Sequence, residues 1–109
     1  MEVYIVCGVF ILFDIVSGFL KAVKGGEVNS SVLREGLFHK AAEVLAIIFA
    51  TVIEYASPYI SLPEGLPLVA VTATYLCVME GISIVENLCA VNPALSKLFA
   101  NYLQKVNKE

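Results

Sequence analysis

The chain has 109 residues, of which 59% are hydrophobic and only 16% are charged, and its mean hydropathy is +0.83. A soluble domain of this size leaves a large fraction of its surface in water, so the composition indicates a membrane protein and excludes an ordinary soluble domain. The net charge of −3 gives no support for nucleic-acid binding, and no nucleic-acid partner is expected.

The first apolar segment is VYIVCGVFILFDIVSGFL, residues 3–20, and it contains a single charge, Asp14. Its length is close to the ~20 residues that a helix needs to cross ~30 Å of hydrocarbon. It has neither a basic region before it nor a cleavage site of small residues, so we predict a retained span over about residues 3–22 and not a signal peptide. Gly25 and Gly26 are expected to end this helix.

A more polar connection follows at residues 23–40 and is predicted to be a cytoplasmic loop. Within it, Asn29, Ser30 or Ser31 can cap the next helix. The stretch SVLREGLFHK is amphipathic, so we expect it to lie at the membrane interface before the chain turns into its second span.

Two further apolar segments are predicted to cross the membrane, at about residues 41–61 and 66–87, with a hairpin rich in proline and glycine between them. An open strand in lipid leaves its backbone groups unsatisfied, so all three spans are expected to be helices. Asn92 and Pro93 are expected to end the third helix, and residues 93–109 are predicted to form an amphipathic tail. The predicted fold is therefore a single domain, residues 1–109, of the all-α membrane class: three transmembrane helices plus a C-terminal amphipathic helix, assembled as an oligomer.

Charge placement predicts how the chain is oriented. With three spans, all basic residues fall on one side of the membrane: Lys21, Lys24, Arg34, Lys40, Lys97, Lys105 and Lys108. The N-terminal segment and the hairpin between the second and third spans contain none. The positive-inside rule therefore predicts a multi-pass protein with its N-terminus outside and its C-terminus in the cytoplasm.

Each predicted span has polar or small residues along one helical face, at spacings of three, four and seven residues. We interpret this polar face as lining a pore or packing helices together. It comprises Asp14, Ser17, Lys21, Glu54, Glu80, Ser83, Glu86 and Asn87. Gly18 and Gly81 are predicted to allow close approach of the helices.

A charged carboxylate near the bilayer centre costs at least ~2.5–3.5 kcal/mol, so the deepest acids, Asp14, Glu54 and Glu80, need shielding. In one interpretation they only hold a small bundle together, either protonated or paired with Lys21 or Lys40. We favour the other, in which the polar faces of several copies meet and line a wet interior, because three helices enclose almost no lumen. On that interpretation the acids are tolerable only because copies of the chain shield them together.

The sequence gives little support for catalysis or cofactor binding. The three cysteines lie in apolar runs, as small buried hydrophobes do, and no C-x-x-C pair is present. The single histidine, His39, is far from all three cysteines. No Ser/His/Asp or Cys/His spacing and no Gly-rich phosphate loop occur. We therefore predict no enzyme activity, no metal site and no cofactor.

Five stretches together resemble a known family: DIVSGFLKAV, NSS, GLFHKA, EGISIVEN and NPALSKL. They are similar to the toxin-secretion/phage-lysis holins, small membrane proteins encoded by phages and prophages of Gram-positive bacteria. The resemblance covers about residues 10–103, and EGISIVEN is its most specific part. The matching positions are Asp14, Gly18, Lys21, Gly36, Lys40, Glu80, Gly81, Ser83, Glu86, Asn87 and Pro93. The chain departs from the family pattern in its modestly basic tail and in the acids Glu43 and Glu54.

The resemblance implies a holin that accumulates in the bacterial host's cytoplasmic membrane, associates with itself and forms lesions at a set time. A cell-wall hydrolase (an endolysin) or, in some relatives, a toxin then passes through, with no direct contact required, and the host cell lyses. The family pattern does not give these residues individual roles; from the polar faces we expect Asp14, Glu54, Glu80 and Asn87 to face helix contacts before triggering and the lumen afterwards. The alternatives are a small proton-coupled transporter or ion channel, an antiholin of the same topology, and a membrane adaptor.

Overall fold

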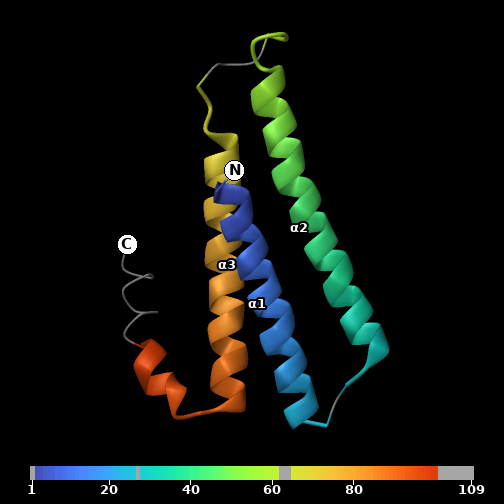
Figure 1. Cartoon of the computed structure of the whole chain (residues 1–109), viewed down its shortest axis with the longest axis vertical. Coiled ribbons are helices and arrows are strands. Elements are labelled where there is room, and N and C mark those ends of the chain that lie inside the picture. The colour runs from blue at the N-terminus through green and yellow to red at the C-terminus, as the bar shows by residue number, and fades with distance from the viewer. Residues whose placement is uncertain (1, 27, 62–64, 101–109) are drawn as a thin grey trace.

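The computed structural model describes residues 2–26, 28–61 and 65–100. It contains three long helices, α1 (Glu2–Lys24), α2 (Ser30–Ala56) and α3 (Leu68–Val91), and a short helical segment at residues 95–100 (Figure 1). All three long helices are long and apolar enough to cross a membrane, and no strand occurs in the described part of the chain. The predicted all-α membrane fold is confirmed. Most of the predicted tail, residues 101–109, lies outside the described residues.

Several helix ends lie where the sequence predicts them. α1 ends at Lys24, and the next turn is closed by Gly26, whose φ of 68° lies in the left-handed region that favours glycine. Asn29 is the N-cap of α2, and its side-chain oxygen accepts a hydrogen bond of 2.9 Å from the backbone N–H of Ser31. Asn92 is the C-cap of α3.

The course of α2 differs from the prediction. α2 begins at Ser30, so residues 31–40 are the first turns of one continuous helix and not a separate segment before the second span. The cap at Asn29 explains this start, because it satisfies the orphan backbone N–H group of Ser31, ten residues before the predicted second span begins at residue 41. With 27 residues, α2 is about 40 Å long and exceeds the ~30 Å hydrocarbon core. It also ends at Ala56, before the predicted end of the second span at residue 61.

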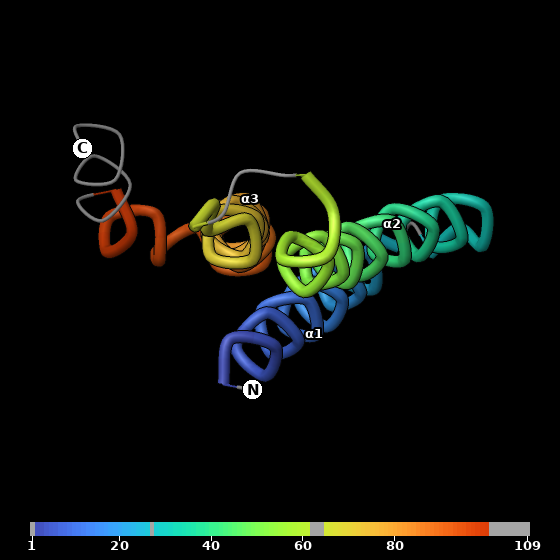
Figure 2. The backbone as a smooth tube through the Cα atoms, turned by 90° about the horizontal axis from the view of Figure 1, so that it is seen from above, coloured from blue at the N-terminus to red at the C-terminus, as the bar shows by residue number. Residues whose placement is uncertain are grey.

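The helices do not pack equally. α1 lies along α3, whereas α2 leans against this pair and diverges from α3 toward its own N-terminal end (Figures 1 and 2). A small apolar core joins all three helices and consists of Cys7, Ile47, Ala73 and Leu76. Large apolar side chains otherwise point outward, as shown by Phe13 at 59% exposed. The surface is therefore suited to lipid, and much of the interior is polar.

Candidate functional site

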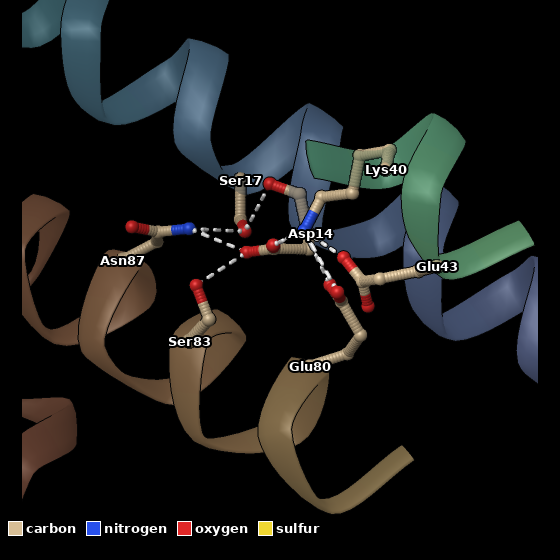
Figure 3. Close-up of polar contacts among 7 residues, drawn as sticks. All are labelled: Asp14, Ser17, Lys40, Glu43, Glu80, Ser83 and Asn87. Carbon is tan, nitrogen blue, oxygen red and sulfur yellow. Dashed lines mark hydrogen bonds and ion pairs between the residues drawn. The ribbon is translucent and has the colours of Figure 1, made fainter. Parts of the chain in front are cut away.

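α1 contributes a carboxylate to the interior of the bundle, where it is surrounded by donors from the other two helices. Asp14 is 8% exposed. Its Oδ1 atom accepts hydrogen bonds from Ser83 Oγ at 2.7 Å and from Asn87 Nδ2 at 3.1 Å, and its Oδ2 atom accepts one from Lys40 (Figure 3). Ser17, one turn further along α1, accepts a second bond of 3.1 Å from Asn87. Both oxygens of the Asp14 carboxylate are thus satisfied.

α3 contributes Glu80, Ser83 and Asn87 from one face, because residues three and seven positions apart align on a helix. Glu80 is 3% exposed, which makes it the most buried acid in the described part of the chain. The predicted polar faces of α1 and α3 therefore do face one another, as Figure 3 shows for these side chains.

α2 contributes the cation that joins the two faces. The ammonium group of Lys40 donates to Asp14 and, at 2.8 Å, to both carboxylate oxygens of Glu80. It also lies 3.5 Å from Glu43 Oε1, three residues further along α2. One lysine is thus shared by three carboxylates that come from three different helices. The formal negative charges of the three carboxylates therefore exceed the positive charge of the single ammonium group by two.

This cluster is closed within a single chain. No buried side-chain nitrogen or oxygen atom lacks a hydrogen-bond partner among residues 2–26, 28–61 and 65–100. The expectation that several copies must gather before Asp14 and Glu80 are shielded is therefore wrong for this state of the chain. The physical reason is Lys40, which supplies charge compensation from within, in line with the pairing that we considered as an alternative.

Three residues of the predicted polar face lie outside the cluster. Lys21 and Glu86 are exposed, and Glu54 is half-buried on α2. Glu54 shares a helical face with the buried Ile47 and Ala50, as the spacing predicts, but it stands 11 residues beyond Glu43. Eleven residues correspond to about 16 Å along a helix, so Glu54 cannot reach the other acids.

Lys40 and Glu43 belong to the cluster although we did not place them on the predicted polar face. Lys40 falls in the predicted loop at residues 23–40, and Glu43 shares the spacing of one helical face with Glu54 but lies near the start of the predicted second span. Two signals pointed to them: their spacing of three residues, which puts both on one side of a helix, and the helix cap at Asn29, which makes α2 continuous through both positions.

The two glycines predicted to allow close packing lie at the contact between α1 and α3. A Cβ atom placed on Gly18 would stand 3.5 Å from Asn87 Nδ2, and one placed on Gly81 would stand 3.5 Å from Phe10 Cε1. Both distances are ordinary van der Waals contacts. The sites therefore have room for a methyl group and for little more.

A groove accompanies the cluster. It has a volume of about 840 Å³ and lies between α1 and the N-terminal half of α2. Its walls are mainly apolar and include Val16, Phe19, Leu33 and Leu37, while Asp14, Lys40, Ser83 and Asn87 also border it. The groove exists because α2 diverges from the α1–α3 pair at this end (Figure 2).

Comparison with known proteins agrees with this architecture. The model of the bacteriophage holin family matches residues 1–108, nearly the whole chain. No match was found among curated proteins or among solved structures. The family match, three apolar helices and the confirmed fold class together show a multi-pass membrane protein of the phage-lysis type. The chain belongs to the bacteriophage holin family.

Proposed function

We propose that this chain associates with itself in the bacterial cytoplasmic membrane and opens lesions that release a cell-wall hydrolase or a toxin. The observation that carries the proposal is the polar cluster of Asp14, Lys40 and Glu80, enclosed in a bundle whose outer surface is apolar. Such a chain shields Asp14 and Glu80 from lipid by itself, yet it holds the polar groups that the wall of a water-filled lesion needs.

Three helices enclose almost no lumen, so a lesion requires several copies with their polar faces turned toward water. Asp14, Glu80 and Asn87 face helix contacts in the closed chain, and we propose that they face the lumen after triggering. Glu54 extends the same face of α2. Lys21 and Glu86 are exposed already, and we propose that they meet a neighbouring copy or lipid headgroups.

We further propose that the N-terminus lies outside the cell and the C-terminus in the cytoplasm. α1 ends, α2 begins and α3 ends at the same end of the bundle (Figure 1). Four basic residues of the described chain belong to this end: Lys21, Lys24, Arg34 and Lys97. Labelling of Glu2→Cys but not Ser96→Cys by a membrane-impermeant thiol reagent on intact cells, in a background without the native cysteines, tests this orientation; the reverse pattern would refute it.

Timed induction in bacteria tests the proposed lesions. The chain is expressed together with a cytoplasmic cell-wall hydrolase, and membrane potential and hydrolase release are followed. We expect a silent interval, then an abrupt loss of potential accompanied by release of the hydrolase. The hydrolase expressed alone is the control and should stay inside. Unchanged potential and growth at high membrane expression of the chain would contradict the proposal.

The same experiment distinguishes the alternatives. A transporter or ion channel would carry small solutes in a saturable manner and would retain the hydrolase. An antiholin would delay the lysis caused by a second holin. A membrane adaptor would tolerate neutral substitutions at Asp14 and Glu80 and would fail when its tail is altered.

A further inference from the structure

α2 is held less firmly than the other two helices. α1 and α3 run together along their length, whereas α2 diverges from α3 toward Ser30, leaving the groove of about 840 Å³ (Figures 1 and 2). At that end the side chain of Lys40 reaches from α2 to Asp14 and Glu80 on the pair. Nearer the other end, Tyr4 and Thr51 share one hydrogen bond of 2.8 Å.

The surface that α2 covers on the α1–α3 pair has a definite chemistry. It presents two carboxylates, Asp14 and Glu80, and beside them the apolar patch of Cys7, Ala73 and Leu76. An occupant must supply a cation for the acids and, further along, an apolar side chain for the patch. Lys40 and Ile47 of α2 meet both requirements, because seven residues correspond to two helical turns on one face.

A second copy of the chain offers the same two groups at the same spacing. Its α2 therefore fits this surface as well as the chain's own α2 does, in both charge and apolar contact. An arbitrary apolar helix would leave Asp14 and Glu80 without a cation, at a cost of several kcal/mol in lipid. Charge complementarity thus selects a second α2 over a lipid chain or an unrelated helix.

The connections of α2 are suited to such a change of partner. On one side Gly26 has a φ of 68°, and on the other Gly65 has a φ of 84°. Five residues, 25–29, join α1 to α2. A segment of that length spans up to about 17 Å, whereas packed helices are 8–10 Å apart, so α2 can move by about one helix diameter without losing turns.

We infer that the α1–α3 face bearing Asp14, Glu80 and Cys7 is an interaction surface for α2 of a second copy, and that Lys40 passes from its own acids to those of a neighbour as copies associate, before their polar faces turn toward water. The inference rests on the proposed function. Exchange of an identical element is a low-cost route to association. Because each copy gives its α2 to the next, the interface is head-to-tail and generates closed rings or open arrays.

Thiol cross-linking between differently tagged copies tests the exchange. One copy keeps only Cys7, with Cys77→Ala and Cys89→Ala. The other has Cys7→Ala, Cys77→Ala, Cys89→Ala and Ile47→Cys. Cys7 and Ile47 belong to one apolar core in the chain, so a short bis-maleimide, which alkylates one thiol at each end, links these copies only if α2 of one lies on the pair of the other. We expect the heterodimeric product to accumulate with expression of the chain, before membrane potential falls.

The matched control places the second thiol on the outer side of α2. Phe49 is 65% exposed, so Phe49→Cys in place of Ile47→Cys reports random collision in the membrane. A heterodimer yield at position 47 no greater than at position 49, while potential is lost and hydrolase is released, would overturn the exchange and leave the proposed function standing. Absence of both lesions and specific product would refute both. Specific product without lesions would support the exchange and refute lesion formation.

A directional pair of variants strengthens the test, because both combinations contain the same substitutions. In the first, the Cys7 copy has Lys40→Gln and keeps its acids, and the Ile47→Cys copy has Asp14→Asn and Glu80→Gln and keeps its lysine. In the second, these substitutions are interchanged. We expect the first combination to yield about fivefold more heterodimer, which corresponds to ~1 kcal/mol of coupling. If both combinations of copies are inserted in the membrane and give equal yields of heterodimer, Lys40 does not direct the exchange of α2.

Discussion

The ammonium nitrogen of Lys40 on α2 lies 2.8 Å from each carboxylate oxygen of Glu80 on α3, and the same ammonium donates to Asp14 on α1. This lysine therefore contacts an acid on both of the other helices at the place where α2 begins to diverge from them. Several consequences of this arrangement can be measured on the isolated protein.

Lys40→Gln should destabilise the bundle by about 3 kcal/mol, because it leaves two buried acids without their cation. Reversible unfolding by SDS in mild detergent micelles measures this, with energy transfer between dyes on α2 and α3 as the signal. Lys97→Gln removes the same charge from an exposed position outside the cluster and is the control. Equal stability of the two variants would show that Lys40 does not hold α2 in place.

The effect of Glu80→Gln should change sign with its background. In the parent chain this substitution removes a partner of Lys40 and should destabilise. In the Lys40→Gln chain it removes a carboxylate that is buried beside Asp14 without a cation, so it should stabilise. The double-mutant cycle should yield a coupling of about 0.5–3 kcal/mol. Additive effects in the same micellar unfolding assay would contradict the direct pairing of Lys40 with Glu80.

Ser83→Ala should cost about 0.6 kcal/mol, the mean for hydrogen bonds between membrane helices. Its hydroxyl donates to Asp14 Oδ1 at 2.7 Å, and Asn87 remains as a donor to the same oxygen at 3.1 Å. Adding Asn87→Ala should cost more than the first substitution, because Oδ1 then has no donor among the described groups of the chain. The free energy of unfolding is measured for the parent chain, for Ser83→Ala and for the double variant. If adding Asn87→Ala lowers it by no more than Ser83→Ala did, the two side chains do not share the role of donor to Asp14 Oδ1.

Gly18→Ala should be tolerated, whereas Gly18→Leu should push α1 away from α3. A Cβ at this position already lies 3.5 Å from Asn87 Nδ2, which leaves no space for a branched side chain. Gly8→Leu is the matched control on the same helix, because a Cβ there meets no atom within 4 Å. Proximity of thiols introduced on α1 and α3 measures the separation, and identical results for both leucine variants would refute close packing at Gly18.

Neutralising acids outside the cluster should have little effect on the closed chain. Glu86 is exposed, so Glu86→Gln should change the free energy of unfolding by less than about 0.5 kcal/mol. Asp14→Asn should lower the free energy of unfolding by clearly more than Glu86→Gln, because it weakens the hydrogen bonds to Lys40 and Ser83. A ranking in which Glu86 matters more than Asp14 would place the important polar contacts elsewhere.

The helices and two of the three polar faces could be predicted from sequence alone. Apolar runs of about 20 residues specify spanning helices, and the spacing of Asp14 with Ser17 and of Glu80 with Ser83 and Asn87 puts each set on one face. Carboxylates are costly in lipid, so it also followed that these faces must be shielded. Local pattern and solvation were sufficient for these conclusions.

The choice of Lys40 over Lys21 as the partner of the acids could not be predicted from spacing alone, because it depends on where α2 begins and how it leans. Residues 31–40 are polar enough to resemble a connection between spans, yet they form the first turns of α2, whose N-cap is Asn29. The long side chain of Lys40 then reaches across to Asp14 and Glu80. Glu54 shows the opposite case: its face was correct, but its position along α2 keeps it away from the other acids.

Since a neighbour's α2 would present the α1–α3 pair with the same lysine and the same isoleucine, exchange would create no new kind of contact and lose none. Solitary and linked chains would then differ little in enthalpy, and surface density would decide between them by mass action. Such a chain remains monomeric while its density in the membrane is low and associates once that density is high. The rate of its synthesis would thereby set a threshold, with no separate sensor needed.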